Sequence, residues 1–241
     1  MSAKLILVGL FHAVAALHSS PLPAVTQDVV SDGGSEHATP ADCLFTVGQG
    51  TSGAELTAFQ NAHSLAGGSS QLGCPTAVVS TSGFTSFKGT VAHYQPFEKG
   101  AIEYHTNGDY SGKAFAVVNP MYEKWHSIGF NQSNPLGYPT GHLSSQQTSY
   151  YLTQYKYQVF ENGSLEWHLT GQRAGSVYEV HGAIYSKWAL KGYAASALGL
   201  PMPDDDQPHP LDERDCLPSQ VTGKQGRVSD FEGGHIHWSS P

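Results

Sequence analysis

The chain has 241 residues, with 12 Lys and Arg against 20 Asp and Glu, and a formal net charge of −8. The acidic excess is concentrated, because residues 204–215 hold six carboxylate side chains and one arginine, and the sequence from residue 43 onward is otherwise neutral. Nucleic acids and anionic membranes are bound by basic surfaces, so neither is an expected partner.

The N-terminal segment has the features of a secretory signal peptide, which we predict to cover residues 1–18. Lys4 supplies the positive start, and the apolar run from Leu5 to Leu17 is too short to span a bilayer. Residues 19–42 are rich in Ser, Pro, Gly and Asp and are predicted to be a flexible leader. We therefore expect a secreted protein, free outside the cell or associated with the cell wall.

Two motifs then recur three times in the same order over residues 43–241. The first is Leu-Gly-x-Pro, and the second is Phe-Glu-x-Gly-x-(Ile/Leu)-x-(Tyr/Trp). Recurrence in a fixed order indicates one supersecondary unit that is used repeatedly. The copies begin at Leu72, Leu136 and Leu198 for the first motif and at Phe97, Phe160 and Phe231 for the second. The predicted modules are residues 43–105, 106–168 and 169–241.

Each module is predicted to contain a helix, a turn and a β-hairpin. Apolar residues at helical spacing predict helices over residues 120–128 and 183–190, and a less regular one over 54–65. Leu-Gly-x-Pro predicts a turn, because glycine accepts backbone conformations that other residues resist and proline fixes the next φ. The second motif predicts a hairpin with two-residue turns. These turns are expected at Lys99-Gly100, Asn162-Gly163 and Gly233-Gly234.

The predicted fold class is therefore α+β. Three helix-turn-β-hairpin modules are expected to pack as a compact pseudo-symmetric array, either propeller-like or stacked. The returning strand of each hairpin alternates between an apolar face, expected in the core, and a face of acids and imidazoles. We expect this acid–imidazole face to be exposed and to supply ligand-binding groups. Its residues are Glu103, His105, Glu166, His168, His235 and His237.

No metal and no cofactor is predicted. Paired side chains at i and i+2 on a strand could present two ligands to a divalent ion, but a closed zinc site needs four ligands and supporting partners. Solvated surface pairs are therefore the favoured interpretation. The acidic stretch 204–215 lacks the ordered spacing of a calcium loop and is interpreted as a solvated insertion.

Aromatic residues divide into an expected core set and two candidate sugar platforms. Aromatic residues on the apolar face of a helix or strand are expected in the core, because aromatic side chains dominate packing in small modules. Tyr138 and the run Tyr150, Tyr151, Tyr155 and Tyr157 lie off that face and are predicted to be exposed sugar platforms, with Tyr138 and Tyr151 as the ligand-binding candidates. The alternative for Tyr151 is an ordinary tyrosine-rich strand. The expected core rings are Tyr104, Trp125, Trp167, Trp188 and Trp238.

Three cysteines follow the leader, and in an oxidising compartment two of them are expected to pair. Cys43 has two possible partners, Cys74 and Cys216, and the sequence does not choose between them. Asn131 and Asn162 stand in N-glycosylation sequons.

No catalytic residue is predicted. The chain has neither a Gly-x-Ser-x-Gly nucleophile elbow nor a phosphate-binding glycine loop. The glutamates beside the motif phenylalanines, Glu98, Glu161 and Glu232, are interpreted as acceptors for turn N–H groups, because a role needed in every copy is seldom catalytic.

The two motifs, with Gly182-Ala183-Ile184-Tyr185-x-Lys187-Trp188 opening a unit, resemble the LGFP repeat family over residues 43–241. The resemblance implies a secreted or cell-wall-associated repeat protein, although this chain carries no attached enzyme domain and has Glu and His at the alternate strand positions. The predicted function is non-catalytic, multivalent binding of cell-wall or other extracellular polysaccharide. The alternatives are a small secreted glycan hydrolase and a structural or host-interaction wall protein without a small-molecule ligand. The sequence predicts no oligomeric state.

Overall fold

The computed structural model describes residues 43, 45, 51–129, 134–203, 214–216 and 226–239. The predicted signal peptide and leader, Asn131 and most of the acidic stretch lie outside the described residues. Asn162 lies within them, and its side-chain amide donates a hydrogen bond to the Pro135 carbonyl at 2.9 Å. The structure contains both helices and antiparallel sheets, as expected of an α+β chain. None of the described helices is long and apolar enough to cross a membrane.

The first sheet has four antiparallel strands in the order β1-β2-β3-β4 and follows two helices. Ser52 caps the first helix, because its hydroxyl accepts a hydrogen bond from the Glu55 N–H at 3.1 Å. The elements are α1 Gly53–Leu65, α2 Gly68–Gln71, β1 Ser80–Thr85, β2 Val91–Phe97, β3 Gly100–His105 and β4 Ala114–Val118.

One α-helix precedes the second sheet and one precedes the third, and the three helices predicted from apolar spacing are all present. The second group comprises α3 Met121–Ser127, β5 Gln147–Thr148, β6 Gln154–Phe160, β7 Gly163–His168 and β8 Val177–His181. The third comprises α4 Gly182–Lys191, a 3-10 turn at Tyr193–Ala195, β9 Arg214–Cys216, β10 Gly226–Phe231 and β11 Gly234–Ser239. Their strand orders are β5-β6-β7-β8 and β9-β10-β11.

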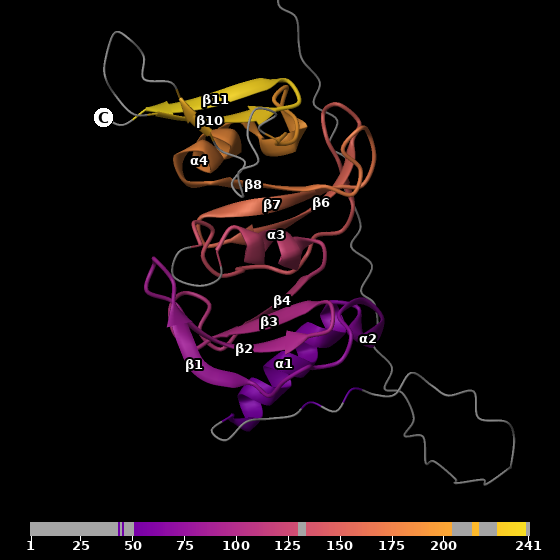
Figure 1. The fold of residues 1–241 in the computed structure, drawn as a ribbon, viewed down its shortest axis with the longest axis vertical. Helices are drawn as coiled ribbons and strands as arrows, with labels where there is room; N and C mark the ends of the chain where they lie inside the picture. The colour runs from indigo at the N-terminus through magenta and orange to yellow at the C-terminus, as the bar shows by residue number, and fades with distance from the viewer. Residues whose placement is uncertain are drawn as a thin grey trace, which may run out of the picture. The chain divides into compact units, whose positions relative to one another are not determined.

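Helices and sheets alternate within the unit formed by residues 39–241 (Figure 1). Helix α3 contacts β3 and β4 of the first sheet and β7 and β8 of the second. Helix α4 contacts β7 and β8 and also β11 of the third sheet. Helices α3 and α4 are therefore each packed between two sheets.

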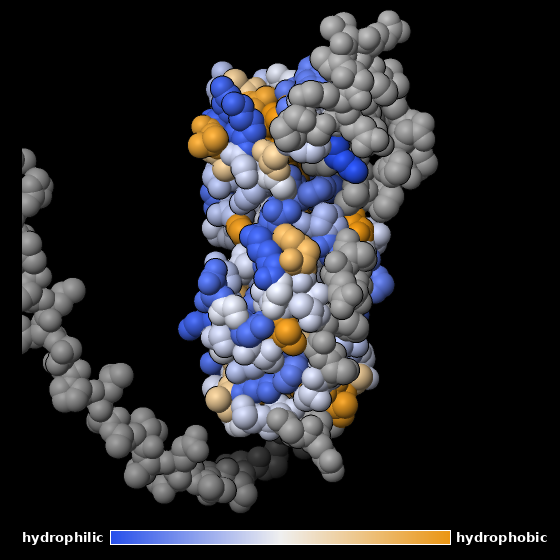
Figure 2. Space-filling view, turned by 90° about the vertical axis from the view of Figure 1, so that its left-hand side faces the viewer, coloured by the Kyte–Doolittle hydropathy of each residue, from blue (hydrophilic) through white to orange (hydrophobic). Residues whose placement is uncertain are grey.

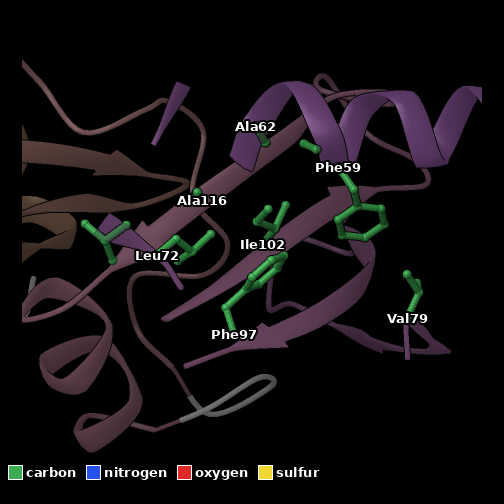
Figure 3. Close-up of a cluster of buried hydrophobic side chains, with 9 residues drawn as sticks. Phe59, Ala62, Leu72, Val79, Phe97, Ile102 and Ala116 are labelled. Atoms are coloured by element: carbon green, nitrogen blue, oxygen red, sulfur yellow. The ribbon is translucent and has the colours of Figure 1, made fainter. Parts of the chain in front are cut away.

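Three hydrophobic clusters fill the spaces between these layers. In the first, Phe59 and Ala62 of α1 lie over Phe97 and Ile102 of the first sheet (Figure 3). Trp125 of α3 and Trp188 of α4 belong to the other two clusters and are buried, which confirms their prediction as core residues. Trp238 is 40 % exposed, so the same prediction is wrong for the last copy.

The two-residue turns lie one position earlier than predicted. Phe97 pairs with Gly100, so the turn consists of Glu98 and Lys99 and the glycine begins the returning strand. The glycine is needed in the strand because the neighbouring strand β4 lies very close to it. A Cβ on Gly100 would lie 2.1 Å from the Val117 carbonyl oxygen of β4. The same shift occurs in the other hairpins, where Phe160 pairs with Gly163 and Phe231 with Gly234.

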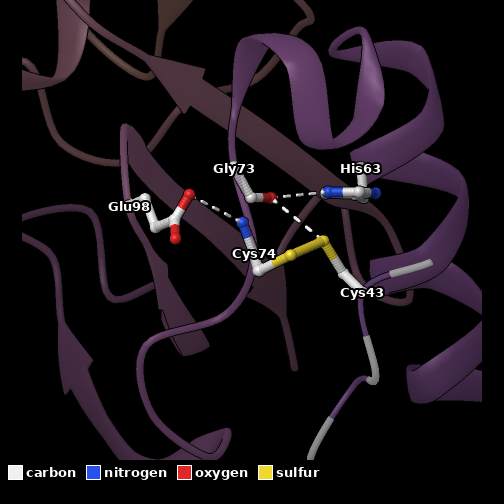
Figure 4. The surroundings of a disulfide bond; sticks show 5 residues. All are labelled: Cys43, His63, Gly73, Cys74 and Glu98. Carbon is white, nitrogen blue, oxygen red and sulfur yellow. Dashed lines mark hydrogen bonds between the residues drawn. A yellow bond between two sulfur atoms is a disulfide. The ribbon is translucent and has the colours of Figure 1, made fainter. Parts of the chain in front are cut away.

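A disulfide joins Cys43 and Cys74, one of the two pairings that the sequence left open (Figure 4). Beside it, the His63 Nε2–H donates to the Gly73 carbonyl at 2.9 Å. In the other two copies a tryptophan of the helix donates the equivalent hydrogen bond to the turn carbonyl. Trp125 Nε1 donates to the Gly137 carbonyl at 3.0 Å, and Trp188 Nε1 donates to the Gly199 carbonyl at 3.1 Å. The helix of every copy is thus anchored to its own Leu-Gly-x-Pro turn.

Candidate functional site

The glutamate of each second motif accepts a turn N–H group, as predicted, but the N–H belongs to the Leu-Gly-x-Pro turn of its own copy and not to the hairpin turn beside the glutamate. Glycine is required in the Leu-Gly-x-Pro turn, because Gly137 has φ +73° and a Cβ there would lie 2.2 Å from Glu161 Oε2. The Oε2–N distances are 3.4 Å for Glu98 and Cys74, 3.0 Å for Glu161 and Tyr138, and 2.9 Å for Glu232 and Leu200.

Two of these glutamates also bind the preceding copy. The Thr90 hydroxyl donates to Glu161 Oε1. The Thr153 hydroxyl donates to Glu232 Oε1 at 2.6 Å. These threonines end a Thr-Ser-aromatic-x-x-Thr turn that occurs twice, at residues 85–90 and 148–153, and that was not among the predicted motifs. The motif glutamates therefore hold consecutive copies together.

Two of the three acid–imidazole faces are buried, so the prediction that they are exposed is wrong for them. Glu103 and His105 are each 1 % exposed, because α3 and the next Leu-Gly-x-Pro turn cover this face of β3. The His105 Nε2–H donates to the Pro139 carbonyl at 2.9 Å, and the His168 Nε2–H donates to the Pro201 carbonyl at 3.1 Å. Burial lowers the pKa of both imidazoles, which favours the neutral form.

The two strand glutamates are buried in the same way. Glu166 is 2 % exposed, and the Ser164 hydroxyl donates to its Oε1 at 2.7 Å. Burial raises the pKa of Glu103 to about 8, so this carboxyl is largely protonated at neutral pH. Each carboxyl lies on the sheet face that is packed against the next helix.

His235 and His237 are exposed, as predicted. They occupy the same face of β11, where no helix covers them in the described part of the chain. The two rings pack edge to face with their centroids 4.7 Å apart. Among the described residues there is no group of three or more His, Cys, Asp or Glu side chains that could hold a metal ion.

The two predicted tyrosine platforms differ in exposure. Tyr138 is 3 % exposed, so its prediction as a surface ring is wrong. Its ring packs edge to face on the His105 imidazole at 5.8 Å, because the turn that carries it is pressed against β3. Tyr151 is 45 % exposed, as predicted, and its hydroxyl donates to the Ala197 carbonyl at 3.0 Å.

The structure instead brings together a tyrosine-lined pocket where the second sheet meets α4. Its volume is about 340 Å³. The carboxyl of Glu166 and the hydroxyl of Ser164 supply buried polar groups, and Gln147 lies on the exposed side. The aromatic residues that line it are Tyr155, Tyr157, Tyr185, Trp188 and Tyr193.

The aromatic rings of this pocket form two contacting groups, one on β6 and one on α4 and the turn after it. Tyr185 contacts Tyr193 with ring centroids 5.9 Å apart, and Tyr155 contacts Tyr157 at 6.3 Å. Burial, together with the nearby Glu166 charge, raises the pKa of Tyr155 to about 12. Burial also raises the pKa of Tyr185. These phenols therefore keep their protons at any physiological pH and can donate to a polar ligand.

A related arrangement recurs where the first sheet meets α3. Tyr94 of β2 pairs with Glu103 of β3, and α3, which carries Tyr122, contacts β3. Burial, followed by the charges of Glu103 and Tyr94, raises the pKa of Tyr122. In the third copy, Val228 and His237 stand at the strand positions. The corresponding triplets are Tyr94, Glu103 and Tyr122 at the first junction and Tyr157, Glu166 and Tyr185 at the second.

Tyr155 and Tyr157 belong to the tyrosine run that was predicted as a sugar platform, and both line the pocket. Tyr94, Tyr122, Tyr185 and Tyr193 were not predicted as site residues, because only rings off the apolar face of an element were considered as platforms. A signal was present, since tyrosine occupies the same strand position and the same helix position in two copies. The face drawn in Figure 2 shows apolar residues as separate small patches among polar ones, with no extended apolar patch.

A scan against protein-family models finds no family that matches the chain, and a search of curated proteins finds no similar protein.

Proposed function

We propose that this protein is a secreted, non-catalytic repeat protein that binds extracellular or cell-wall polysaccharide through its tyrosine-lined junctions. The observation that carries the proposal is the pocket of about 340 Å³ in which four tyrosines and one tryptophan surround a carboxyl group. Ligand pockets of roughly 300–1,000 Å³ typically combine aromatic walls with a few polar groups. Sugars match this chemistry, because their ring faces are apolar and their edges carry hydroxyl groups.

The proposal takes the three units as copies of one LGFP-like module in a linear stack. Each contact between copies then creates one junction, and the two junctions carry the same Tyr-Glu-Tyr triplet. Two weak sites on one body gain from linkage, because engagement of the second becomes intramolecular. Sites of this kind suit a polymer that repeats its own unit.

Tyr157 is the residue with which to test the proposal, because it lines the pocket and is 36 % exposed. We expect Tyr157→Ala to weaken retention on an insoluble wall polysaccharide about tenfold, the equivalent of about 1.4 kcal/mol. Tyr150→Ala is the matched control, because Tyr150 is 58 % exposed in the turn between β5 and β6 and does not line the pocket. Combining Tyr157→Ala with Tyr122→Ala should reduce binding in a second step.

Depletion assays over a panel of polysaccharides would measure these effects. Equal retention of the Tyr157→Ala and Tyr150→Ala variants on every retained polysaccharide would contradict the proposed site. Failure of the unmodified chain to bind any of them would contradict the function itself. Release of reducing ends in the same incubations would favour the hydrolase alternative.

A further inference from the structure

A groove lies between helix α4 and strand β11, which contact each other in the third copy (Figure 1). Its volume is about 840 Å³, within the range of roughly 300–1,000 Å³ that is typical of ligand pockets. None of the described residues lines both this groove and the tyrosine-lined pocket. The groove is therefore a second candidate site, separate from the junctions.

One wall of the groove is a row of side chains on α4. Ala183, Lys187 and Lys191 all line it, and residues four apart lie on one face of a helix, with their Cβ atoms about 5–6 Å apart. Both lysines are exposed, and neither forms an ion pair with another residue in the described part of the chain. This wall therefore offers two positive charges to a ligand.

The other wall is formed by β11 and includes an exposed aromatic ring. Trp238 lines the groove and is 40 % exposed. In the second copy Trp167 occupies the equivalent strand position, and the Lys156 ammonium lies over its ring at 5.8 Å from the ring centre. An indole that is open to solvent offers a flat apolar surface, on which the apolar face of a sugar ring can stack.

The groove carries positive charge although the chain as a whole is acidic. No Asp or Glu is among the described residues that line it, whereas the formal net charge of the chain is −8. The imidazole of His235 adds a group that can donate a hydrogen bond. A ligand that matches this groove therefore has negative charges, polar edges and apolar ring faces.

The helix of the second copy does not offer the same wall. The shared sequence Tyr-x-Lys-Trp aligns α3 with α4, and Ile128 then occupies the position of Lys191. Ile128 is buried in the second hydrophobic cluster, so this position takes part in packing. Lys191 is exposed and lines the groove instead. The pair of lysines is thus a feature of the third copy and not of the repeated module.

We propose that this groove binds an acidic polysaccharide whose sugar rings carry carboxylates. One ring stacks on the Trp238 indole, and carboxylates of the same polymer bind the ammonium groups of Lys187 and Lys191. The opposite charges speed association and favour acidic polymers, and the aromatic contact favours sugars over other anions. The groove shares no residue with the tyrosine-lined pocket, so the proposal does not rest on the function proposed for that pocket.

An oligogalacturonate and its methyl ester are the matched probes, because they share the sugar ring and differ in charge. The full chain should bind the acid at least tenfold more tightly than the ester, and added salt should weaken only the acid. Isothermal titration calorimetry measures both affinities. Trp238 is the most exposed of the four tryptophans, so the acid should also change the tryptophan emission, and Trp238→Phe should remove that change.

Variants of the full chain test the two walls separately. The double variant Lys187→Ala, Lys191→Ala should weaken the acid about tenfold and leave the ester unchanged, whereas arginine at both positions should preserve binding of the acid. Lys113→Ala is the matched control, because Lys113 is exposed and does not line the groove. Trp238→Ala should weaken both ligands. Far-UV circular dichroism checks that each variant is folded.

Absence of binding by the oligogalacturonate, or equal affinity for the acid and its ester, would overturn the proposal. So would unchanged binding to the folded double alanine variant. A polyglutamate peptide that binds as tightly as the acid, and that Trp238→Ala does not affect, would show a general anion-binding surface and no sugar site. Loss of the acid in Tyr157→Ala, with none in the lysine variants, would place the ligand in the tyrosine-lined pocket and overturn the groove while leaving the proposed function intact.

Discussion

The glutamates of the second motif give the sharpest test of how the copies are joined, because their hydrogen-bond partners differ from one copy to the next. Glu232 accepts hydrogen bonds from Leu200 N at 2.9 Å, from the Ser149 hydroxyl at 3.1 Å and from the Thr153 hydroxyl at 2.6 Å. Glu98 accepts one bond, from Cys74 N at 3.4 Å, and is exposed. Substitution by alanine should therefore have unequal effects.

The expected loss can be worked out from these contacts. In Glu232→Ala the N–H of Leu200, a fully buried residue, loses its acceptor, which costs about 1–3 kcal/mol. The two hydroxyls lose a charged acceptor but can turn elsewhere, which adds about 1 kcal/mol each. The total is about 3–5 kcal/mol. Glu98→Ala removes one long, exposed bond and should cost at most about 1 kcal/mol.

Thermal unfolding followed by circular dichroism measures the difference. For a unit of this size, 1 kcal/mol corresponds to about 2–4 °C in Tm, so Glu232→Ala should lower Tm by about 10 °C and Glu98→Ala by no more than about 4 °C. Equal shifts for the two variants would refute the idea that these glutamates join consecutive copies. The result would then indicate that each acts only within its own turn.

Two further predictions concern stability. The folded pKa of Glu103, about 8, lies above the unfolded value of 4.5, so the folded state binds the extra proton and this residue makes the fold less stable as pH rises from about 4.5 to 8. Glu103→Gln should therefore raise Tm more at pH 8 than at pH 5, and an equal change at both would contradict the burial argument. Leu152 has φ +65° where the first copy has Gly89 at φ +82°, so Leu152→Gly should stabilise by up to about 1 kcal/mol and Gly89→Ala should destabilise by a similar amount in chemical denaturation. Changes of the same sign in the two variants would show that backbone strain is not the cause.

The sequence predicted the parts of the fold whose signals are local. The three helices and three hairpins follow from apolar spacing and from strict alternation, and all six are present. Strands β4 and β8 were missed for a physical reason. Every residue of β4 is buried, so its sequence shows no alternation, and a short apolar run of this kind does not reveal whether it forms a strand.

The candidate site was less predictable, because alternation separates two faces of a strand without showing what covers each of them. Glu103 and Glu166 were expected on the surface since carboxylates are rarely buried, yet the helix of the next copy covers both. His237, at the same position in the last copy, is exposed as predicted. The difference comes from contacts distant in sequence, which no local pattern contains.

The contact between consecutive copies has one more consequence. His105 of β3 and His168 of β7 donate to backbone carbonyls of the following Leu-Gly-x-Pro turn. Every amino acid carries such a carbonyl, so this contact does not depend on the side chain of the residue that accepts it. A further copy whose turn keeps the same backbone shape can therefore accept the imidazole before it, which lets the number of copies change without a new kind of contact between them.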